Sequence, residues 1–460
     1  LFKKIKGKPY SINTIDKILD EIDSITTLEQ YKFIKANVSE EVNNDLINLQ
    51  FNIAEGEKFY VDRINIYGNT ITAENVIRNQ FELDEGDPFS EILVNKSINN
   101  IKSLNFFKTV NSKINTNDNE KTKEIDIFIE EKPTGEIYAT AGAGTSGASF
   151  GFGIKENNFL GNGIGLDTNA LISSSQFKGK FTITNPNYNN SNKSLYGSVE
   201  ATETDNYNTF GYKTNKTGFR IGTNFEYLND FYIGLNTSNF YETIETNSTA
   251  STQQQSQEGN YWDTFIKFDM NYDKRNQKFQ TTSGFKSFYS ISLPIVSDTS
   301  TLKNYYNYSK YFSFYEKNFS SVSLYLQSAN SINNNNIKLS ERITIPSSRL
   351  RGFEYGRVGP KDGDDFIGGN YAYSLNFASS LPLIFEDSQN FDLLFFADIA
   401  DIWGVDYNSS IKGNGTRSSL GIALDWLTPI GPMNFSLAYP ISRQTSDKTE
   451  TFRFNLGTTF

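Results

Sequence analysis

Residues 451–460 read Thr-Phe-Arg-Phe-Asn-Leu-Gly-Thr-Thr-Phe, and the chain stops on that aromatic residue. In an extended strand, successive side chains point to opposite faces. One face then holds Phe452, Phe454, Leu456, Thr458 and Phe460, and the other holds Arg453, Asn455, Gly457 and Thr459. This pattern is typical of a strand in a membrane barrel, with lipid on one side, a wet lumen on the other and a ring at the headgroups. A half-buried strand of a soluble sandwich is the alternative for this segment alone.

Composition narrows the class of protein. The 460 residues carry a net charge of −10 and contain neither Cys nor His. The acidic balance argues against nucleic acid as a partner, and the two missing residue types remove disulfides, thiolate or imidazole metal sites and Ser-His or Cys-His mechanisms. These missing residue types are in keeping with our expectation of no enzyme activity, no cofactor and no metal. Aromatic residues reach 15% although mean hydropathy is negative, which favours a barrel with rings outside and polar residues inside.

The chain shows neither a membrane-spanning helix nor an export signal. No run of about 18 apolar residues is present, so we expect no transmembrane helix. The start, Leu1-Phe2-Lys3-Lys4, does not read as a signal peptide. Because an outer-membrane protein needs such a signal, we expect a fragment or a processed chain.

The first 134 residues hold one and a half copies of a small unit. Gly7, Pro9, Tyr10 and Ser11 match Gly86, Pro88, Phe89 and Ser90, each 79 positions later. An amphipathic helix follows in both copies, with Ser11 or Ser90 as its expected N-cap. The second copy predicts the order β-α-α-β-β, with a strand at 60–67, a turn at Gly68-Asn69, helices near 73–81 and after Ser90, and strands near 107–114 and 124–130. The first copy lacks the opening strand and helix.

This unit resembles a POTRA domain, the periplasmic module of outer-membrane assembly factors. The resemblance is carried by Phe59-Tyr60-Val61 with Ile64, Gly68-Asn69, Val76-Ile77-Arg78, Gly86 with Phe89, and Leu104 with Phe106-Phe107. The family usually has Gly where this chain has Asn105, and Asn tolerates a left-handed backbone. A generic α+β domain is the alternative. The resemblance implies a truncated POTRA domain in residues 1–57 and a complete one in residues 58–134.

Residues 135–460 predict one membrane β-barrel. Alternating segments replace the helical spacing after Lys132-Pro133-Thr134. They lie at 149–154, 179–183, 219–226, 262–272, 284–293, 321–327, 371–377, 391–399, 420–426 and 433–441. Polar stretches such as 189–192 and 249–260 indicate solvated loops between them. At ~20 residues for a strand and its connection, the region accommodates roughly 16 antiparallel strands.

The first barrel strand, expected near 136–144, is poor in packing groups. Ile137, Ala139, Ala141 and Ala143 alternate with Tyr138, Thr140, Gly142 and Gly144. Good cross-strand pairs contribute ~0.2–1 kcal/mol each, and Gly brings no side chain to such a pair. The seam between this strand and the terminal one is therefore expected to be the weakest in the barrel. Residues 142–147 also satisfy G-x-G-x-x-G, but strand spacing follows where a dinucleotide site needs a helix.

One loop and one strand carry charges that can meet inside the barrel. Leu350-Arg351-Gly352-Phe353 lies in a stretch rich in Gly, Asp and Arg that extends to Gly369. Asp398 shares the non-lipid face of the strand 391–399 with Phe396. An inward loop Arg and an inward Asp can form a charge-assisted contact. A solvated surface Arg is the alternative reading of the motif alone.

Together these features resemble the BamA family of outer-membrane assembly barrels over essentially the whole chain. In that family an Arg-Gly-Phe motif at a loop tip folds into the lumen and meets a Phe-x-Asp-x-Gly strand. Arg351, Gly352 and Phe353 match the motif, in a loop near 346–369, and Phe396 and Asp398 match the strand. Ala400 stands where the family has the last Gly. Phe454, Leu456, Gly457 and Phe460 resemble the family's C-terminal β-signal.

The resemblance implies a protein of the bacterial outer membrane with POTRA domains in the periplasm. It would insert and fold barrel proteins without ATP, by templated strand pairing at a lateral seam. The implied partners are unfolded outer-membrane proteins, periplasmic lipoprotein subunits of the assembly complex, and outer-membrane lipid. A two-partner secretion transporter and a TamA-type assembly barrel share these features and stay open. A His-dependent outer-membrane enzyme is excluded, and the POTRA-like unit disfavours a plain porin.

Overall fold

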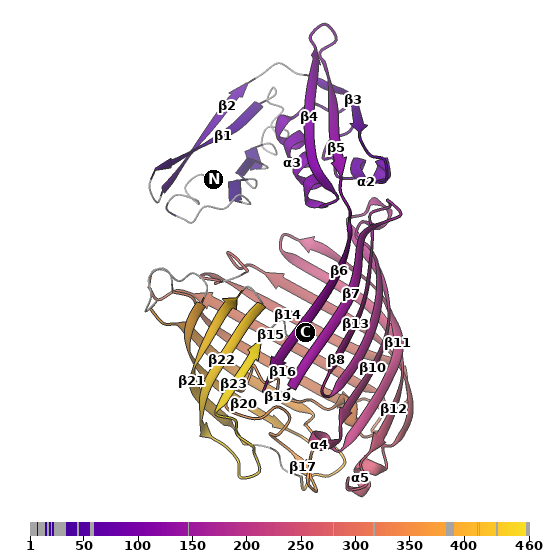
Figure 1. The fold of residues 1–460 in the computed structure, drawn as a ribbon, viewed down its shortest axis with the longest axis vertical. Coiled ribbons are helices and arrows are strands. Elements are labelled where there is room, and N and C mark those ends of the chain that lie inside the picture. The colour runs from indigo at the N-terminus through magenta and orange to yellow at the C-terminus, as the bar shows by residue number, and fades with distance from the viewer. Residues whose placement is uncertain are drawn as a thin grey trace. The chain divides into compact units, whose positions relative to one another are not determined.

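The structure is a computed structural model. It describes residues 7, 14–15, 18–19, 21–22, 34–43, 46–55, 59–145, 147–278, 280–315, 318–382, 391–411, 413, 415–428 and 431–456. The chain divides into two compact units (Figure 1). Unit 1 comprises Leu1–Gly135 and Glu156–Ile164, and unit 2 comprises Glu136–Lys155 and Gly165–Phe460.

Unit 1 contains the complete β-α-α-β-β module that the sequence predicts. Its strands are β3 (Tyr60–Tyr67), β4 (Phe107–Asn117) and β5 (Thr122–Glu131), and its helices are α2 (Glu74–Arg78) and α3 (Glu91–Ser103). The sheet order is β3-β5-β4, with β3 parallel and β4 antiparallel to β5. Apolar faces of the sheet and helices meet in one core around Ile77, Ile101 and Ile125, which are completely buried.

Local signals explain where these helices begin and end. The Ser90 hydroxyl accepts a hydrogen bond from the Leu93 N–H, so Ser90 caps α3 as expected. Asn105 has φ 59°, the left-handed conformation expected where the family has Gly. Helix α2 is shorter than predicted because the chain after it changes to the hydrogen-bond pattern of a 3-10 turn. The backbone N–H groups of Gln80 and Phe81 donate to carbonyls three residues earlier.

The half copy at the N-terminus is described in part. Strands β1 (Ile34–Asn43) and β2 (Leu46–Glu55) form an antiparallel hairpin, and β2 contains the alternating strand predicted there. Ile15, Ile18 and Ile22 are buried on short helical pieces. Ile25, part of the expected apolar face, lies outside the described residues.

The turn between β7 and β8 belongs with unit 1. The barrel predicted from the sequence, residues 135–460, had included this turn. Ala73 N–H donates to the Gly161 carbonyl at 2.9 Å, and the Asn158 amide donates to the Thr72 hydroxyl at 2.9 Å. Gly161 has φ 74°, and a Cβ there would lie 2.0 Å from the Ile71 carbonyl oxygen. Only Gly therefore permits this approach of two backbones, a contact that strand periodicity does not reveal.

Within the described residues, sixteen antiparallel strands close into a barrel in unit 2, as the sequence predicts. They are β6 (Gly135–Gly144), β7 (Gly147–Phe159), β8 (Ile164–Ser173), β9 (Gln176–Asn185), β10 (Lys193–Asn206), β11 (Tyr212–Leu228), β12 (Phe231–Thr246), β13 (Gly259–Asp273), β14 (Gly284–Ser297), β15 (Thr301–Phe312), β16 (Ser320–Ser331), β19 (Tyr371–Ser380), β20 (Phe391–Trp403), β21 (Arg417–Thr428), β22 (Gly431–Ser442) and β23 (Phe452–Leu456). Short elements in the connections are η2 (Tyr188–Asn190), α4 (Tyr207–Phe210), α5 (Thr252–Gln255), η3 (Leu339–Glu341), β17 (Lys361–Asp362) and β18 (Asp365–Phe366). Closure pairs the last strand with the first, so backbone groups of both strands can hydrogen-bond across the seam.

Each of the predicted strand segments lies in a barrel strand, but four strands, β8, β10, β12 and β15, were not picked out from the sequence. Strand β15 shows why: Tyr305 and Tyr306 are neighbours and therefore point to opposite faces, so apolar and polar residues no longer alternate. Ring residues can face either lipid or lumen in a barrel, which weakens the period-two signal.

The polar stretch 249–260 is not the solvated loop that its composition predicted. It contains α5, capped by Ser251, and it leads into β13. Gln254 is completely buried, and its amide donates to the Phe210 carbonyl at 3.1 Å. A buried polar group is stable when it is hydrogen-bonded, so composition alone does not fix exposure.

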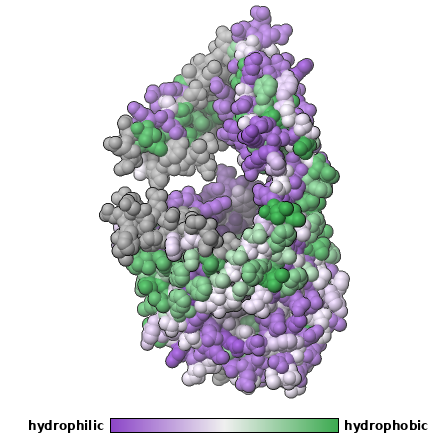
Figure 2. Space-filling view, in the orientation of Figure 1, coloured by the Kyte–Doolittle hydropathy of each residue, from purple (hydrophilic) through white to green (hydrophobic). Residues whose placement is uncertain are grey.

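The outward face of the barrel carries the apolar side chains. On β7, Phe150, Phe152 and Ile154 are half exposed and alternate with inward residues. Figure 2 shows hydrophobic side chains gathered in a belt across the strands and hydrophilic ones at the end near α5 and β17. An apolar belt of this kind matches a bilayer core. Among the described residues, no helix has the length and apolar character needed to span a membrane.

The end of β5 is fixed by one carboxylate in unit 1. Glu131 accepts hydrogen bonds from the backbone N–H groups of Thr70, Ile71 and Thr72 at 2.9, 2.9 and 2.6 Å, and from the Thr70 hydroxyl at 2.7 Å. Burial raises the pKa of Glu131, but hydrogen bonds from Thr72, Thr70 and Ile71 outweigh burial and lower the pKa from 4.5 to about 2. The ionised carboxylate therefore stabilises the fold above about pH 4.5, and this stabilisation is lost as pH falls towards about 2.

We expect Glu131→Gln to lower the free energy of unfolding of unit 1 by about 1–3 kcal/mol at neutral pH, because charge-assisted hydrogen bonds are lost. Hydrogen exchange of peptides from residues 59–132, measured in the full chain, reports this change in the free energy of unfolding. The variant should also lose less protection than the unmodified chain on acidification below about pH 4.5. Glu130→Gln is the control, since Glu130 is exposed and pairs with exposed Lys108. Equal acid sensitivity in the variant and the unmodified chain would contradict the assignment.

Candidate functional site in the lumen loop and barrel seam

The chain between β16 and β19, residues 332–370, is termed the lumen loop, and from Ile337 onward it packs against the inner wall of the barrel. It begins earlier than the predicted 346–369. Ile337, Ile343, Leu350 and Phe353 of the loop pack with Tyr325 and Ile402 of the barrel wall in a buried apolar cluster. Part of the lumen is therefore dry, whereas the sequence predicted a wet interior. A loop with its own apolar core can hold a fixed position against the wall.

The loop tip binds the strand predicted to receive it. Arg351 Nε donates to Asp398 Oδ2 at 2.8 Å, and Nη2 donates to Asp398 Oδ1 at 2.7 Å. The Arg351 backbone N–H and the Asn376 amide also donate to this carboxylate, at 3.1 and 2.8 Å. Asp398 is completely buried, and four donors satisfy it. The pair is bidentate, the strongest form of Arg–carboxylate contact.

The other motif residues fit this geometry closely. The Arg351 guanidinium lies 3.5 Å from the centroid of the Phe396 ring, which is completely buried. Gly352 has φ 89°, and a Cβ there would lie 3.1 Å from the Ala438 Cβ and 3.4 Å from the Ser419 Cβ. Both the backbone conformation and the space at this position require Gly. Ala400, which replaces the family's Gly, is also buried in the lumen cluster and leaves room for the loop.

A second anchor, which sequence patterns do not predict, holds the loop near its start. Lys338, with 1% of its side chain exposed, pairs with Glu242 of β12 at 2.7 Å and with Asp263 of β13. Glu242 and Asp263 sit on lumen-facing positions of their strands, which is the only sequence signal they give. Nothing in the sequence indicates which loop cation they meet. The loop is thus tied to β12–β13 near its start, through Lys338, and to β20 at its tip, through Arg351.

The seam between β23 and β6 closes the barrel. Asn455 lies opposite Gly144, and Leu456 lies opposite Ala143, and these are the seam pairs among the described residues. The other side of β23 pairs with β22 from Met433–Leu456 to Leu437–Phe452. A Cβ at Gly144 would lie 2.7 Å from the Phe454 carbonyl oxygen, so Gly here permits close approach of β23. The idea that this seam is the weakest in the barrel stays a prediction.

The first strand has the two faces expected from alternation. Ile137 and Ala139 are exposed on the outer face, whereas Tyr138, Gly142 and Gly144 are less exposed. The Tyr138 ring covers Gly153 of β7: a Cβ there would lie 2.3 Å from the ring. Gly153 brings no side chain of its own, but the neighbouring Tyr138 ring fills the space above it.

The C-terminal segment is described up to Leu456. The Phe454 ring stacks on Phe435 of β22 and on Phe452, with centroid distances of 6.2 and 6.4 Å. Leu456 completes the described part of β23. Gly457 and Phe460, the other members of the expected β-signal, lie outside the described residues.

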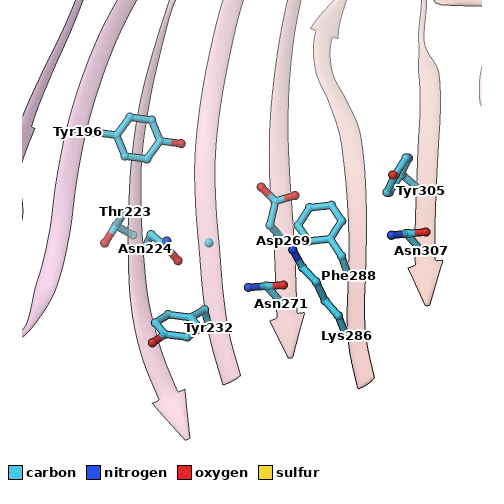
Figure 3. A pocket seen from close by; sticks show the side chains of 11 residues that line it. Tyr196, Thr223, Asn224, Tyr232, Asp269, Asn271, Lys286, Phe288, Tyr305 and Asn307 are labelled. Carbon is cyan, nitrogen blue, oxygen red and sulfur yellow. The ribbon is translucent and has the colours of Figure 1, made fainter. Parts of the chain in front are cut away.

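A polar cavity of about 630 Å³ lies along the wall of β10–β15 (Figure 3). Asp269, Asn271 and Lys286 lie between rings that include Tyr196 and Tyr305. Arg349 of the lumen loop donates to Asn307 at its edge, at 2.8 Å. The described residues contain no group of three or more carboxylates placed to hold a metal ion. The side chains that line the cavity supply hydrogen-bonding and charged groups.

Family models match most of the chain. The Omp85 superfamily domain matches residues 158–460, and the POTRA model, described as a surface antigen variable number repeat, matches residues 59–132. The outer membrane protein assembly factor BamA of Neisseria meningitidis serogroup B is 24% identical over 510 residues, covering 99% of this chain and 63% of the relative. The chain thus spans less than two thirds of that relative's length.

Solved structures share the fold. The crystal structure of BamA from Haemophilus ducreyi lacking POTRA domains 1–3 is similar with a TM-score of 0.82 and 24% identity, covering 99% of this chain and 95% of that one. CdiB from Escherichia coli is similar with a TM-score of 0.56 and 12% identity, covering 98% and 85%. The chain therefore shares its fold with these structures.

We expect Arg351→Ala and Asp398→Ala each to lower the free energy of unfolding by about 1–3 kcal/mol, because each leaves a buried charged group without its partner. The double variant should lose no more than the larger single loss, since both remove one interaction. Urea unfolding in lipid or detergent, followed by tryptophan fluorescence, measures these values. Glu354→Ala, at an exposed position of the same loop, is the control and should change little. Fully additive losses would show that the two residues do not act together.

Proposed function

Because this chain belongs to the Omp85 superfamily, we propose that it is the central subunit of an outer-membrane β-barrel assembly machinery, which inserts and folds outer-membrane proteins. Support comes from similarity along almost the whole chain to a protein named outer membrane protein assembly factor BamA. CdiB from Escherichia coli is less similar, with a TM-score of 0.56 against 0.82, so the two-partner secretion alternative is less well supported. The TamA-type alternative stays open.

The observation that carries the proposal is the seam. Strand β23 is held by β22 on one side and meets glycine-rich β6 on the other through Asn455–Gly144 and Leu456–Ala143. A seam whose described pairs involve Gly and Ala gains little from side-chain packing, so it can open locally while the other strand pairs stay closed. An opened seam exposes backbone N–H and C=O groups that cannot stay unpaired in hydrocarbon. An incoming strand satisfies them by pairing with the edge, so the barrel templates a new sheet.

This function assigns a location and partners. The barrel spans the outer membrane, and the POTRA domains lie in the periplasm. The partners are unfolded outer-membrane proteins, periplasmic lipoprotein subunits of the complex, and outer-membrane lipid; nucleic acid is not among them. Strand pairing needs no covalent step, so we propose no enzyme activity and no cofactor. The apolar belt outside the barrel supports the membrane location (Figure 2).

A disulfide across the seam tests this mechanism, because the chain contains no Cys of its own. Ala143→Cys with Leu456→Cys places thiols on opposed seam positions. The oxidised form should fold normally but lose insertion of client barrels into vesicles, and reductant should restore insertion. Phe395→Cys with Ile422→Cys, opposed on β20 and β21, is the matched control and should insert clients in both redox states. Full insertion by the seam-locked protein would rule out a lateral gate.

A further inference from the structure

The lumen loop continues from its tip into contact with the chain that leads to the terminal strand. Phe353 and Thr449 form an antiparallel bridge, and Glu450 N–H donates to the Gly352 carbonyl at 3.0 Å. Glu354 N–H donates to the Lys448 carbonyl at 3.1 Å. Residues 352–354 and 448–450 therefore run as a short paired ribbon. This ribbon ends two residues before β23 begins at Phe452.

Arg453 extends this attachment into β23 itself. Its side chain points into the lumen and is 8% exposed. Nε donates to Glu450 Oε2 at 2.8 Å, and Nη2 donates to the same oxygen and to the Phe353 carbonyl at 3.1 Å. One guanidinium thus joins the seam strand, the segment before it and Phe353, the third residue of the Arg351-Gly352-Phe353 motif. The same loop tip is held on β20 by Arg351 and Asp398.

Packing stability alone does not explain why Arg occupies position 453. Nη1 is buried without a hydrogen-bond partner among the described residues, an arrangement that disfavours Arg over a smaller residue. The donors that are satisfied bind the lumen-loop carbonyl of Phe353 and the neighbouring Glu450. The contacts of Arg453 thus favour one connection, between the seam strand and the loop.

We propose that Arg453, with Glu450, is a positioning residue that fastens the start of β23 to the tip of the lumen loop. With this clamp in place, β23 keeps its pairing with β22 when the seam to β6 opens, so the barrel opens at one edge only. Without this clamp, β23 separates from β22, beginning at Phe452. The consequence for client insertion rests on the proposed function, whereas the clamp itself does not.

Hydrogen exchange measured by mass spectrometry on the full chain in bilayer nanodiscs tests the clamp. Arg453→Gln should speed the exchange of amides 452–456 by on the order of tenfold, the effect of losing a charge-assisted hydrogen bond on local opening. Exchange in β20 and β21 should stay unchanged. Arg342→Gln is the matched control, because it removes a buried lumen Arg that binds Asp406 and Asn370 instead, and it should leave β23 unaffected.

A covalent replacement of the clamp separates positioning from a merely structural role. Glu354→Cys with Lys448→Cys, at adjacent points of the paired ribbon, should slow exchange in β23 of the Arg453→Gln variant when oxidised, and reductant should reverse this. Unchanged exchange of 452–456 in Arg453→Gln would overturn the proposal, and so would equal acceleration in all strands. If exchange responds as expected but even the unmodified protein inserts no clients, the clamp stands and the proposed function fails.

Discussion

A sheet that crosses hydrocarbon has to pair every backbone N–H and C=O group, and this constraint organises the whole molecule. The sixteen strands of the described chain satisfy it by closing on one another. Closure makes the last strand meet the first, so the contact between β23 and β6 is imposed by the membrane even where side chains add little to it. The barrel therefore has one strand pair, β23 with β6, whose stability is free to vary. In this chain β6 contributes Gly142, Gly144 and alanines to that pair.

The lumen loop supplies the side-chain packing that the seam lacks. Its apolar cluster around Leu350 and Phe353 gives the barrel an internal core. Its ion pairs tie it to β12 and β13 through Lys338 and to β20 through Arg351. Buried ion pairs add less to net stability than their Coulomb attraction suggests, because both charges are removed from water. Their geometric specificity matters more here, since they fix one loop at defined points of the wall.

The loop tip links the interior of the barrel to its seam. Arg351, Gly352 and Phe353 contact β20, the β21–β22 pair and the segment entering β23 in that order along the chain. The position of β23 is thus set from inside the lumen as well as by β22. A protein that uses an open strand edge needs such support, because an unsupported edge strand frays or pairs with the wrong partner.

The sequence by itself determined the two architectures and the lipid and lumen faces, whereas the pairing of Arg351 with Asp398 was expected from the family resemblance. Period-two alternation survives in most strands, and the β-α-α-β-β order follows from local caps and turns at Ser90, Gly68 and Asn105. Tertiary structure alone decided the partners of Lys338, Arg453 and Gln254. Each of these polar groups is buried against residues far away in the chain, and a charge or amide in a sequence carries no mark of which distant group will satisfy it. The same holds for Gly161, whose role is visible only when a second backbone lies against it.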